Sequence, residues 1–174
     1  MKKLFLAAFA VFAFASVNAQ DTTFGATAGL TILSPDVEGG DVDSETGFHI
    51  GAFAEIGISD QFSIQPELTY AMAGDISMIA LNAMAKYHVS EEFNIHAGPQ
   101  IGFAGGDDID DIEDILGDDF TKLNLQLAIG VGYDITEEIF AQARYGFQLN
   151  DHFTGDEDFG IKINTITIGV GYRF

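Results

Sequence analysis

The sequence predicts an all-β protein: an eight-stranded antiparallel up-and-down transmembrane β-barrel with short periplasmic turns and longer extracellular loops. Three observations support this prediction. Apolar and polar residues alternate over eight segments, the connections between segments alternate between short and long, and the chain starts like an exported protein. Strict alternation indicates a strand with one apolar and one polar face. Short turns at one end and long loops at the other are typical of outer-membrane barrels.

The first 19 residues have the composition of a secretory signal peptide. Two lysines precede an apolar run, and small residues follow it, with Val17 and Ala19 at the positions that signal peptidase reads. We therefore expect a signal peptide over 1–19 and one outer-membrane barrel domain over 20–174, with the mature chain beginning at Gln20. The alternative is a membrane anchor helix, but the run is shorter than the ~20 residues that a span needs.

Charge and composition exclude one class of function. The chain has 27 acidic and 7 basic residues, and the signal peptide contains two of the basic ones, so the mature charge is 5 − 27 = −22. A nucleic-acid binder needs a basic surface, so we expect no nucleic-acid partner. The chain contains no cysteine, so no disulfide supports the fold. We expect no cofactor.

The eight alternating segments each have roughly the 9–11 residues that a tilted membrane strand requires. They are residues 24–32, 48–58, 63–72, 79–88, 93–103, 122–133, 141–150 and 165–174. The segment at 79–88 is the weakest because alanine is common on its apolar side. The segment at 122–133 is the clearest, with leucine, isoleucine, valine and tyrosine at every odd position from Leu123 to Tyr133.

The connections predict which end of the barrel is which. Short ones at 59–61, 90–92 and 136–138 are near-repeats, and the parity of their flanking strands predicts loops of three or five residues rather than two. Long connections lie at 34–46, 104–120 and 151–161, and the fourth, near Gly74 and Asp75, is short. Pro66 and Pro99 fall inside strands, where we expect a bulge or a position near the rim.

The polar face of the strands distinguishes a membrane barrel from a soluble one. The alternative is a soluble barrel of the lipocalin kind, with its apolar residues inside. Most strand glycines lie on the polar face, which fits a narrow, crowded lumen. Aromatic residues collect on the apolar face near the short turns, where an interfacial girdle would lie. We therefore expect the apolar face to contact outer-membrane lipid.

Several segments resemble a known family. They are Phe62–Tyr70, Ala85–His88, Phe93–Pro99, Arg144–Gly146 and Tyr172–Phe174, and they are similar to the PorT-like outer-membrane β-barrel family, often labelled "porin family". The resemblance implies insertion by the barrel-assembly machinery, with Tyr172 and Phe174 as the assembly signal. It implies little about function. One departure is that Asn82 or Ala83 stands where the family usually has a proline.

The lumen face carries a candidate ion-pair network. Glu55 and Glu67 lie on neighbouring strands near the same turn, and Lys86 and Arg144 lie at comparable height on other strands. Two enclosed carboxylates repel each other unless cations lie between them. We expect Glu55 and Glu67 to share a network with Arg144, Lys86 or both, which plugs the periplasmic half. The alternative is a set of separate, solvated charges.

The 104–120 connection contains the densest charge, with eight carboxylates among residues 107–119. Carboxylates are ligands for Ca²⁺ or Mg²⁺, but the spacing does not match an EF-hand. The candidate metal ligands are Asp107, Asp108, Asp110, Asp111, Glu113 and Asp114. The alternative is a solvated acidic loop without metal. An extracellular ligand or divalent cations are the partners that such loops suggest.

These features predict a monomeric outer-membrane protein with a structural, adhesive or surface-binding role. An eight-stranded interior is just wide enough for side chains, so we do not expect an open porin. A narrow channel for ions or small solutes is one alternative. A lipid-modifying enzyme is another, but no spacing singles out Ser44, Ser77 or His49, and we expect no enzymatic activity.

Overall fold

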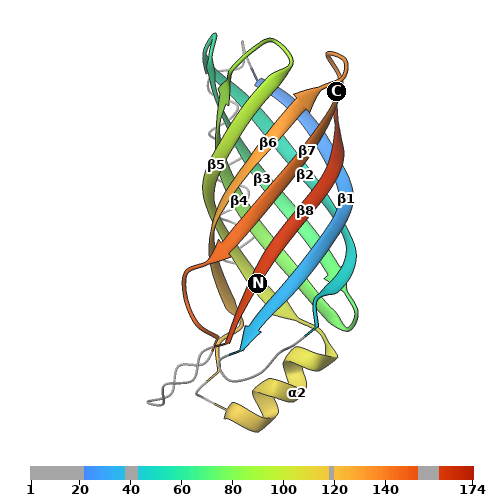
Figure 1. Cartoon of the computed structure of the whole chain (residues 1–174), viewed down its shortest axis with the longest axis vertical. Helices are drawn as coiled ribbons and strands as arrows, with labels where there is room; N and C mark the ends of the chain where they lie inside the picture. Colours follow the sequence, from blue (N-terminus) through green and yellow to red (C-terminus); the bar gives the residue numbers. More distant parts are fainter. Residues whose placement is uncertain (1–21, 38–42, 118–119, 153–160) are drawn as a thin grey trace.

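The computed structural model describes residues 22–37, 43–117, 120–152 and 161–174, so the predicted signal peptide lies outside the described residues. Eight strands form one closed antiparallel barrel in sequence order, and each pairs with the next (Figure 1). The elements are β1 (Thr22–Val37), β2 (Glu45–Ser59), β3 (Phe62–Ala73), β4 (Ile76–His88), β5 (Phe93–Gly105), α2 (Asp107–Leu116), β6 (Leu123–Asp134), β7 (Ile139–Gln148) and β8 (Ile161–Arg173). The predicted fold class is confirmed.

The alternation of the sequence becomes an outer and an inner face. On β6, Leu127 is 45% exposed and Val131 is 43% exposed, whereas Asn124 and Gln126 are buried. The same alternation runs along the other strands, so the barrel is apolar outside and polar inside. A soluble barrel would have the reverse arrangement, and only a lipid environment makes an apolar outer surface favourable.

The three short connections gather at one end, the upper end in Figure 1. We call this the turn end; in outer-membrane barrels it faces the periplasm. In each turn a hydroxyl oxygen accepts a hydrogen bond from the backbone N–H three residues later. The Phe62 N–H donates to Ser59 Oγ at 3.2 Å, and the Phe93 N–H donates to Ser90 Oγ at 3.1 Å. Thr136 does the same for Ile139. The near-repeat in the sequence therefore reflects a hydrogen bond that all three turns share.

The predicted loop lengths are confirmed for two of these turns. The last paired residues are His88 with Asn94 in one turn and Asp134 with Phe140 in the other, so five residues separate each pair. The β2–β3 turn differs. Its strands keep the expected parity as far as Gly57 and Ser63, but a register shift then pairs Ser59 with Phe62 and leaves two residues at the tip. A bulge absorbs the extra residue.

The two prolines do not occupy bulges or rims as expected. Pro66 and Pro99 lie within β3 and β5, and the register is the same on both sides of each. The pairing is interrupted instead: β2–β3 lacks partners between Phe53 and Ile56, and β4–β5 lacks them between Asn82 and Ala85. Proline has no N–H to donate, so the ladder loses contacts locally without changing its register.

The opposite end, the loop end, differs most from the sequence-based expectation. Three strands extend into the segments expected to be loops. Strand β1 continues to Val37, β2 begins at Glu45 and β8 begins at Ile161. The acidic 104–120 connection was expected to be a loop, but it contains the helix α2. Ile109 on this helix is 2% exposed, and isoleucine or leucine recurs at three- or four-residue spacing from there to Leu116, as in an amphipathic helix. Among the described residues, no helix has the length and apolarity to cross a membrane.

Candidate functional site

The inner face of the barrel carries a continuous set of polar contacts that we call the lumen network. Each member has the inward parity of its strand, so the alternation itself places the side chains in the lumen. The network contains one or two residues from every strand: Thr27, Glu55, Gln65, Glu67, Lys86, His96, Asp134, Arg144 and Arg173.

Two ion pairs form the centre of the network. Arg144 Nη1 donates to Glu67 Oε2 at 2.6 Å, and Lys86 Nζ donates to Glu55 Oε2 at 2.9 Å. The Glu67 side chain is 1% exposed and that of Lys86 is 4% exposed. Charges this deeply buried are tolerable only when they are paired and hydrogen-bonded. The structure thus brings all four sequence-proposed lumen residues to the same region.

Neutral side chains join the two ion pairs into one unit. The Gln65 side chain accepts from Lys86 at 3.2 Å and donates to Glu67 at 3.3 Å. Arg144 Nε lies 3.0 Å from His96 Nε2, and the other ring nitrogen of His96 contacts Asn94. Because an arginine nitrogen can only donate, Nε2 must be the acceptor and Nδ1 must carry the proton. These contacts fix the orientation of the Arg144 guanidinium.

Two phenylalanines fill the lumen beside the network. Phe53 and Phe140 point inward despite being aromatic and pack edge to face, with ring centroids 5.6 Å apart. A Cβ at Gly25 or Gly171 would overlap these rings, so glycine is needed at both positions. The Arg173 guanidinium lies 4.6 Å above the centre of the Phe140 ring, a cation–π arrangement. The rings close space that the polar side chains leave open.

Arg173 is a basic network member that the sequence analysis missed. It donates from Nη2 to Asp134 Oδ1 at 2.7 Å and from Nε to Glu55 Oε2 at 3.4 Å. The alternation carries a signal for this placement, because Arg173 has the same odd-numbered parity as Gly169 and Gly171 on β8. Three of the five basic residues that follow residue 19 thus lie inside the barrel.

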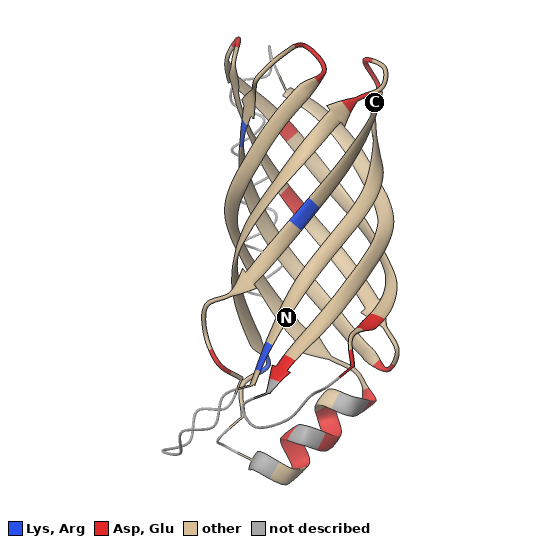
Figure 2. Ribbon diagram, in the orientation of Figure 1, with Lys and Arg blue, Asp and Glu red and all other residues tan. Residues whose placement is uncertain are grey.

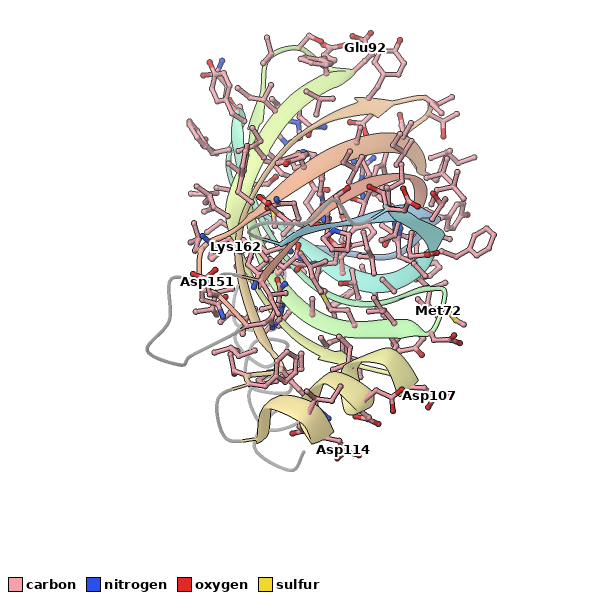
Figure 3. All side chains as sticks on the ribbon, turned by 60° about the horizontal axis from the view of Figure 1, so that its bottom comes forward. Met72, Glu92, Asp107, Asp114, Asp151 and Lys162 are labelled. Carbon is pink, nitrogen blue, oxygen red and sulfur yellow. The ribbon has the colours of Figure 1, made fainter. Side chains whose placement is uncertain are left out.

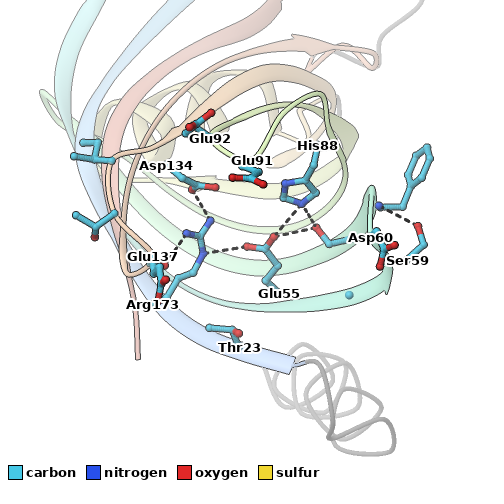
Figure 4. A pocket seen from close by; sticks show the side chains of 15 residues that line it. Thr23, Glu55, Ser59, Asp60, His88, Glu91, Glu92, Asp134, Glu137 and Arg173 are labelled. Atoms are coloured by element: carbon cyan, nitrogen blue, oxygen red, sulfur yellow. Dashed lines mark hydrogen bonds and ion pairs between the residues drawn. The ribbon is translucent and has the colours of Figure 1, made fainter.

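A vestibule of about 570 Å³ opens at the turn end above the network (Figure 4). Glu55, His88, Asp134 and Arg173 form its floor, and the turn residues Asp60, Glu91, Glu92 and Glu137 stand around it. Its charge is therefore mostly negative. Glu55 in its floor is paired with Lys86, whose Nζ lies 5.5 Å from the centre of the Phe140 ring.

A serine, a histidine and a carboxylate meet in this vestibule, so the enzyme alternative can be tested against geometry. Ser63 Oγ lies 3.0 Å from Glu55 Oε1 and 3.2 Å from His88 Nε2, and the Glu55 oxygen lies 3.6 Å from that same histidine nitrogen. A catalytic triad needs the carboxylate on the other ring nitrogen, so that one face of the histidine is oriented while the other takes the serine proton. This cluster does not have that arrangement.

The loop-end half of the lumen is more apolar. Leu33, Ala73 and Ile163 form a buried cluster, with Ile76 packed against it. Between this cluster and the ion pairs lies a cavity of about 40 Å³, bordered by His49, Glu67, Asn82 and Arg144 among others. A cavity of this size holds one or a few water molecules. The buried ion pairs therefore lie on one side of this cavity and the apolar cluster lies on the other.

The acidic segment is organised by α2 and Lys122. Figure 2 shows acidic residues concentrated on this helix at the loop end, and Figure 3 shows the helix beside the barrel opening. Lys122 Nζ lies 2.7 Å from both Asp110 and Glu113, and these two carboxylates raise the pKa of Lys122 to about 12. Within the described part of the chain, no three histidine or acidic side chains are grouped as a metal site requires.

The remaining candidates are the two terminal aromatics. Tyr172 and Phe174 face outward, 49% and 80% exposed, with ring centroids 5.6 Å apart. The backbone N–H of Phe174 donates to the Phe24 carbonyl on β1. Their rings are thus available to lipid, or to another protein, at the turn end.

A closed antiparallel barrel that is apolar outside and charged inside is the architecture of an outer-membrane β-barrel protein. The chain belongs to the outer membrane protein beta-barrel domain family, whose model matches residues 4–174. This supports an outer-membrane location. The finer PorT-like assignment is not part of this match. No curated protein matches the chain.

Solved structures show the same fold. The attachment invasion locus protein Ail of Yersinia pestis is similar with a TM-score of 0.58 and 14% identity, over 89% of this chain and 100% of Ail. Neisserial surface protein A gives a TM-score of 0.56 and 17% identity, over 88% and 98% of the two chains. OprG of Pseudomonas aeruginosa gives 0.50 and 13%, over 88% and 96%. At such identities the likeness concerns the fold alone.

Proposed function

We propose that the protein is a closed, monomeric outer-membrane barrel that acts at its surface-exposed loops, in a structural, adhesive or surface-binding role, and does not conduct solutes. The observation that carries this proposal is the filled lumen. The Arg144–Glu67 pair and the Phe53 and Phe140 rings are buried in the periplasmic half, and an apolar cluster is buried near the loop end. A narrow channel would need a continuous aqueous path through both.

The loop end limits the kind of ligand. Described acidic residues there include Asp43, Glu45, Asp75 and those of α2, whereas Lys122 and Lys162 are already beside carboxylates. One structure of Ail contains the heparin analogue sucrose octasulfate. Such a polyanion would meet the same sign of charge on this chain, so we do not carry that ligand over. A cationic partner, or an anionic surface bridged by divalent cations, fits the charge.

The PorT-like resemblance and the lipid and assembly-machinery partners belong to the same proposal. The PorT-like resemblance rests on the sequence segments named above, and the two partners are supported by the outward apolar face and by the outward Tyr172 and Phe174 rings. The lipid-modifying alternative gains no support from the Ser63, His88 and Glu55 cluster, in which the carboxylate and the serine share one histidine nitrogen.

Planar-bilayer recording of the purified protein tests the closed barrel. We expect no steady conductance, and Arg144→Ala should also create no selective channel because Phe53, Phe140 and the apolar cluster remain. Steady large conductance in the wild type would overturn the proposal.

The surface role is tested separately in a deletion strain, by envelope leakage and by adhesion. Wild-type protein is compared with a variant in which Asp110, Asp111, Glu113 and Asp114 become the corresponding amides. If only wild-type protein restores the phenotype, the acidic loop carries the function. If both restore it, the role is structural and resides in the barrel.

A further inference from the structure

The contact between β1 and β8 is the seam that joins the two ends of the barrel. Thirteen consecutive residue pairs line it, from Gly25 with Arg173 to Val37 with Ile161. Every other neighbouring pair of strands is also connected by the chain, whereas β1 and β8 are held together only by non-covalent contacts. The seam is therefore the place where the barrel can open while every strand stays paired with its neighbours in the sequence.

Arg173 sits at the turn-end edge of this seam and reaches past both neighbouring strands. Its Nε contacts Glu55 on β2, which lies beyond β1, at 3.4 Å. Its Nη2 contacts Asp134 on β6, which lies beyond β7, at 2.7 Å. The guanidinium also donates to the Glu137 carbonyl and lies over Phe140. Figure 4 shows it between the two carboxylates.

Only one of these contacts crosses the seam. Asp134, Glu137 and Phe140 lie on the β7 side and would move with β8, whereas Glu55 lies on the β1 side. Glu55 is in turn held by Lys86 at 2.9 Å, and Lys86 is joined through Gln65 to the Arg144–Glu67 pair. Opening of the seam would separate Arg173 from Glu55. The side chains of both residues are only 12–13% exposed, so water screens them poorly.

We propose that the Arg173 side chain stabilises the closed β1–β8 seam and so couples closure of the barrel to the lumen network. We call this role the lock of the seam. The side chain holds β8 to the far side of the seam, in addition to the backbone ladder. This role is distinct from that of the outward-facing Tyr172 and Phe174. It acts in the folded barrel and requires no assembly machinery.

The test uses purified protein refolded into lipid vesicles, where no assembly machinery is present. Arg173→Gln should accelerate unfolding in urea roughly tenfold or more, because it removes one member of a buried charged cluster. Because the chain has no cysteine, paired cysteines can be introduced cleanly. Ala28→Cys with Val170→Cys crosslinks the seam, and Ile64→Cys with Ala85→Cys crosslinks β3 to β4; both are facing pairs on the outer side.

The seam crosslink should restore nearly the wild-type unfolding rate to Arg173→Gln, and the β3–β4 crosslink should leave most of the defect. Equal rescue by both crosslinks, rescue by neither, or no defect in Arg173→Gln would each overturn the lock. If Arg173→Gln refolds poorly, Arg173→Lys is carried through the same two backgrounds, and the same difference between crosslinks is required.

Discussion

At the scale of single residues, the molecule depends on how its few cations are used. Arg144 pairs with Glu67, which is 1% exposed, and is oriented by His96 and Gln142. A buried ion pair of this kind need not be more stabilising than an apolar pair. Removing one partner, however, leaves the other as an unpaired buried charge, which is strongly unfavourable.

Arg144→Ala should therefore destabilise the barrel by about 3–5 kcal/mol, because Glu67 is left as an uncompensated buried charge. The measurement is equilibrium unfolding in urea of protein in lipid vesicles. The double variant Arg144→Ala with Glu67→Gln is the matched control and should recover a large part of the loss. A single variant as stable as the double variant would contradict a charge-based origin.

His152 at the loop end makes a pH-dependent contribution. It is 1% exposed and stacks on Phe120, and its Nδ1 donates to the Thr121 carbonyl at 2.6 Å. Its Nε2 therefore lacks a proton and faces the Asn124 amide at 3.4 Å. Burial lowers the pKa of His152, and the Thr121 carbonyl and Asp151 only partly oppose this.

Because the folded pKa of His152 lies below the unfolded value of 6.5, the opened loop end binds the proton first. The stabilisation is complete above pH 6.5 and is lost as the pH falls below it. We expect faster hydrogen exchange at the His152 and Ile163 amides at pH 5.5 than at pH 7.5, after correction for intrinsic rates. In His152→Gln this pH dependence should vanish, and its persistence would assign the effect to Asp151 or another group.

At the scale of elements, the strands follow the sequence alternation and α2 does not. Period-two alternation is a property of neighbouring residues, so it could be read directly. The helix depends on a partner: Ile109 becomes buried only because the loop-end rim of β4 and β5 offers a surface. A dense acidic segment alone is equally compatible with a loop.

Depth in the bilayer should decide which outward substitutions are tolerated. Leu127→Arg, on the outer face within β6, should cost about 2–4 kcal/mol and block insertion, whereas Leu149→Arg, just beyond the end of β7, should cost about 0–1 kcal/mol. Heat-modifiable migration on gels after refolding measures the insertion of the two variants. Equal tolerance of the two would contradict the outward orientation of the apolar face.

Inward parity alone would make Gln126→Arg a mild substitution, and here the structure changes the expectation. Gln126 is 1% exposed, donates to the Ile163 carbonyl and accepts from Thr165. Among the described residues, Gln126 is bonded to a carbonyl and a hydroxyl rather than to a carboxylate, and Gly146 packs closely against it, so the larger cation of Gln126→Arg should also be destabilising.

At the scale of the whole molecule, assembly and stability should be separable at the C-terminus. The Phe174 ring is 80% exposed, so Phe174→Ser removes little packing from the folded barrel. We expect refolding into vesicles to be nearly unchanged, while cells should accumulate less assembled protein. The assay is the heat-modifiable band from membrane fractions. Equal assembly of both proteins in cells would contradict a role of Phe174 as an assembly signal.

The whole barrel was accessible from the sequence because its determinants are local and repeated. Eight alternating segments, three similar turns and an even strand number leave few ways to close an antiparallel sheet. The parity of a strand also assigns a residue to the lumen, which is how Glu55, Glu67, Lys86 and Arg144 could be grouped in advance. Parity does not give height, however, because height depends on the stagger of each strand against its neighbours.

The alternation of residues along the chain therefore specifies the barrel, its two faces and the charge available to its lumen. The tertiary structure decided the contacts between strands: Arg144 with Glu67, Lys86 with Glu55, and Arg173 across the seam. It also decided that Phe53 and Phe140 fill the lumen opposite two glycines and that an acidic connection becomes a helix. The physical reason is that alternation is encoded between neighbouring residues, whereas these contacts join residues that only closure of the barrel brings to the same height.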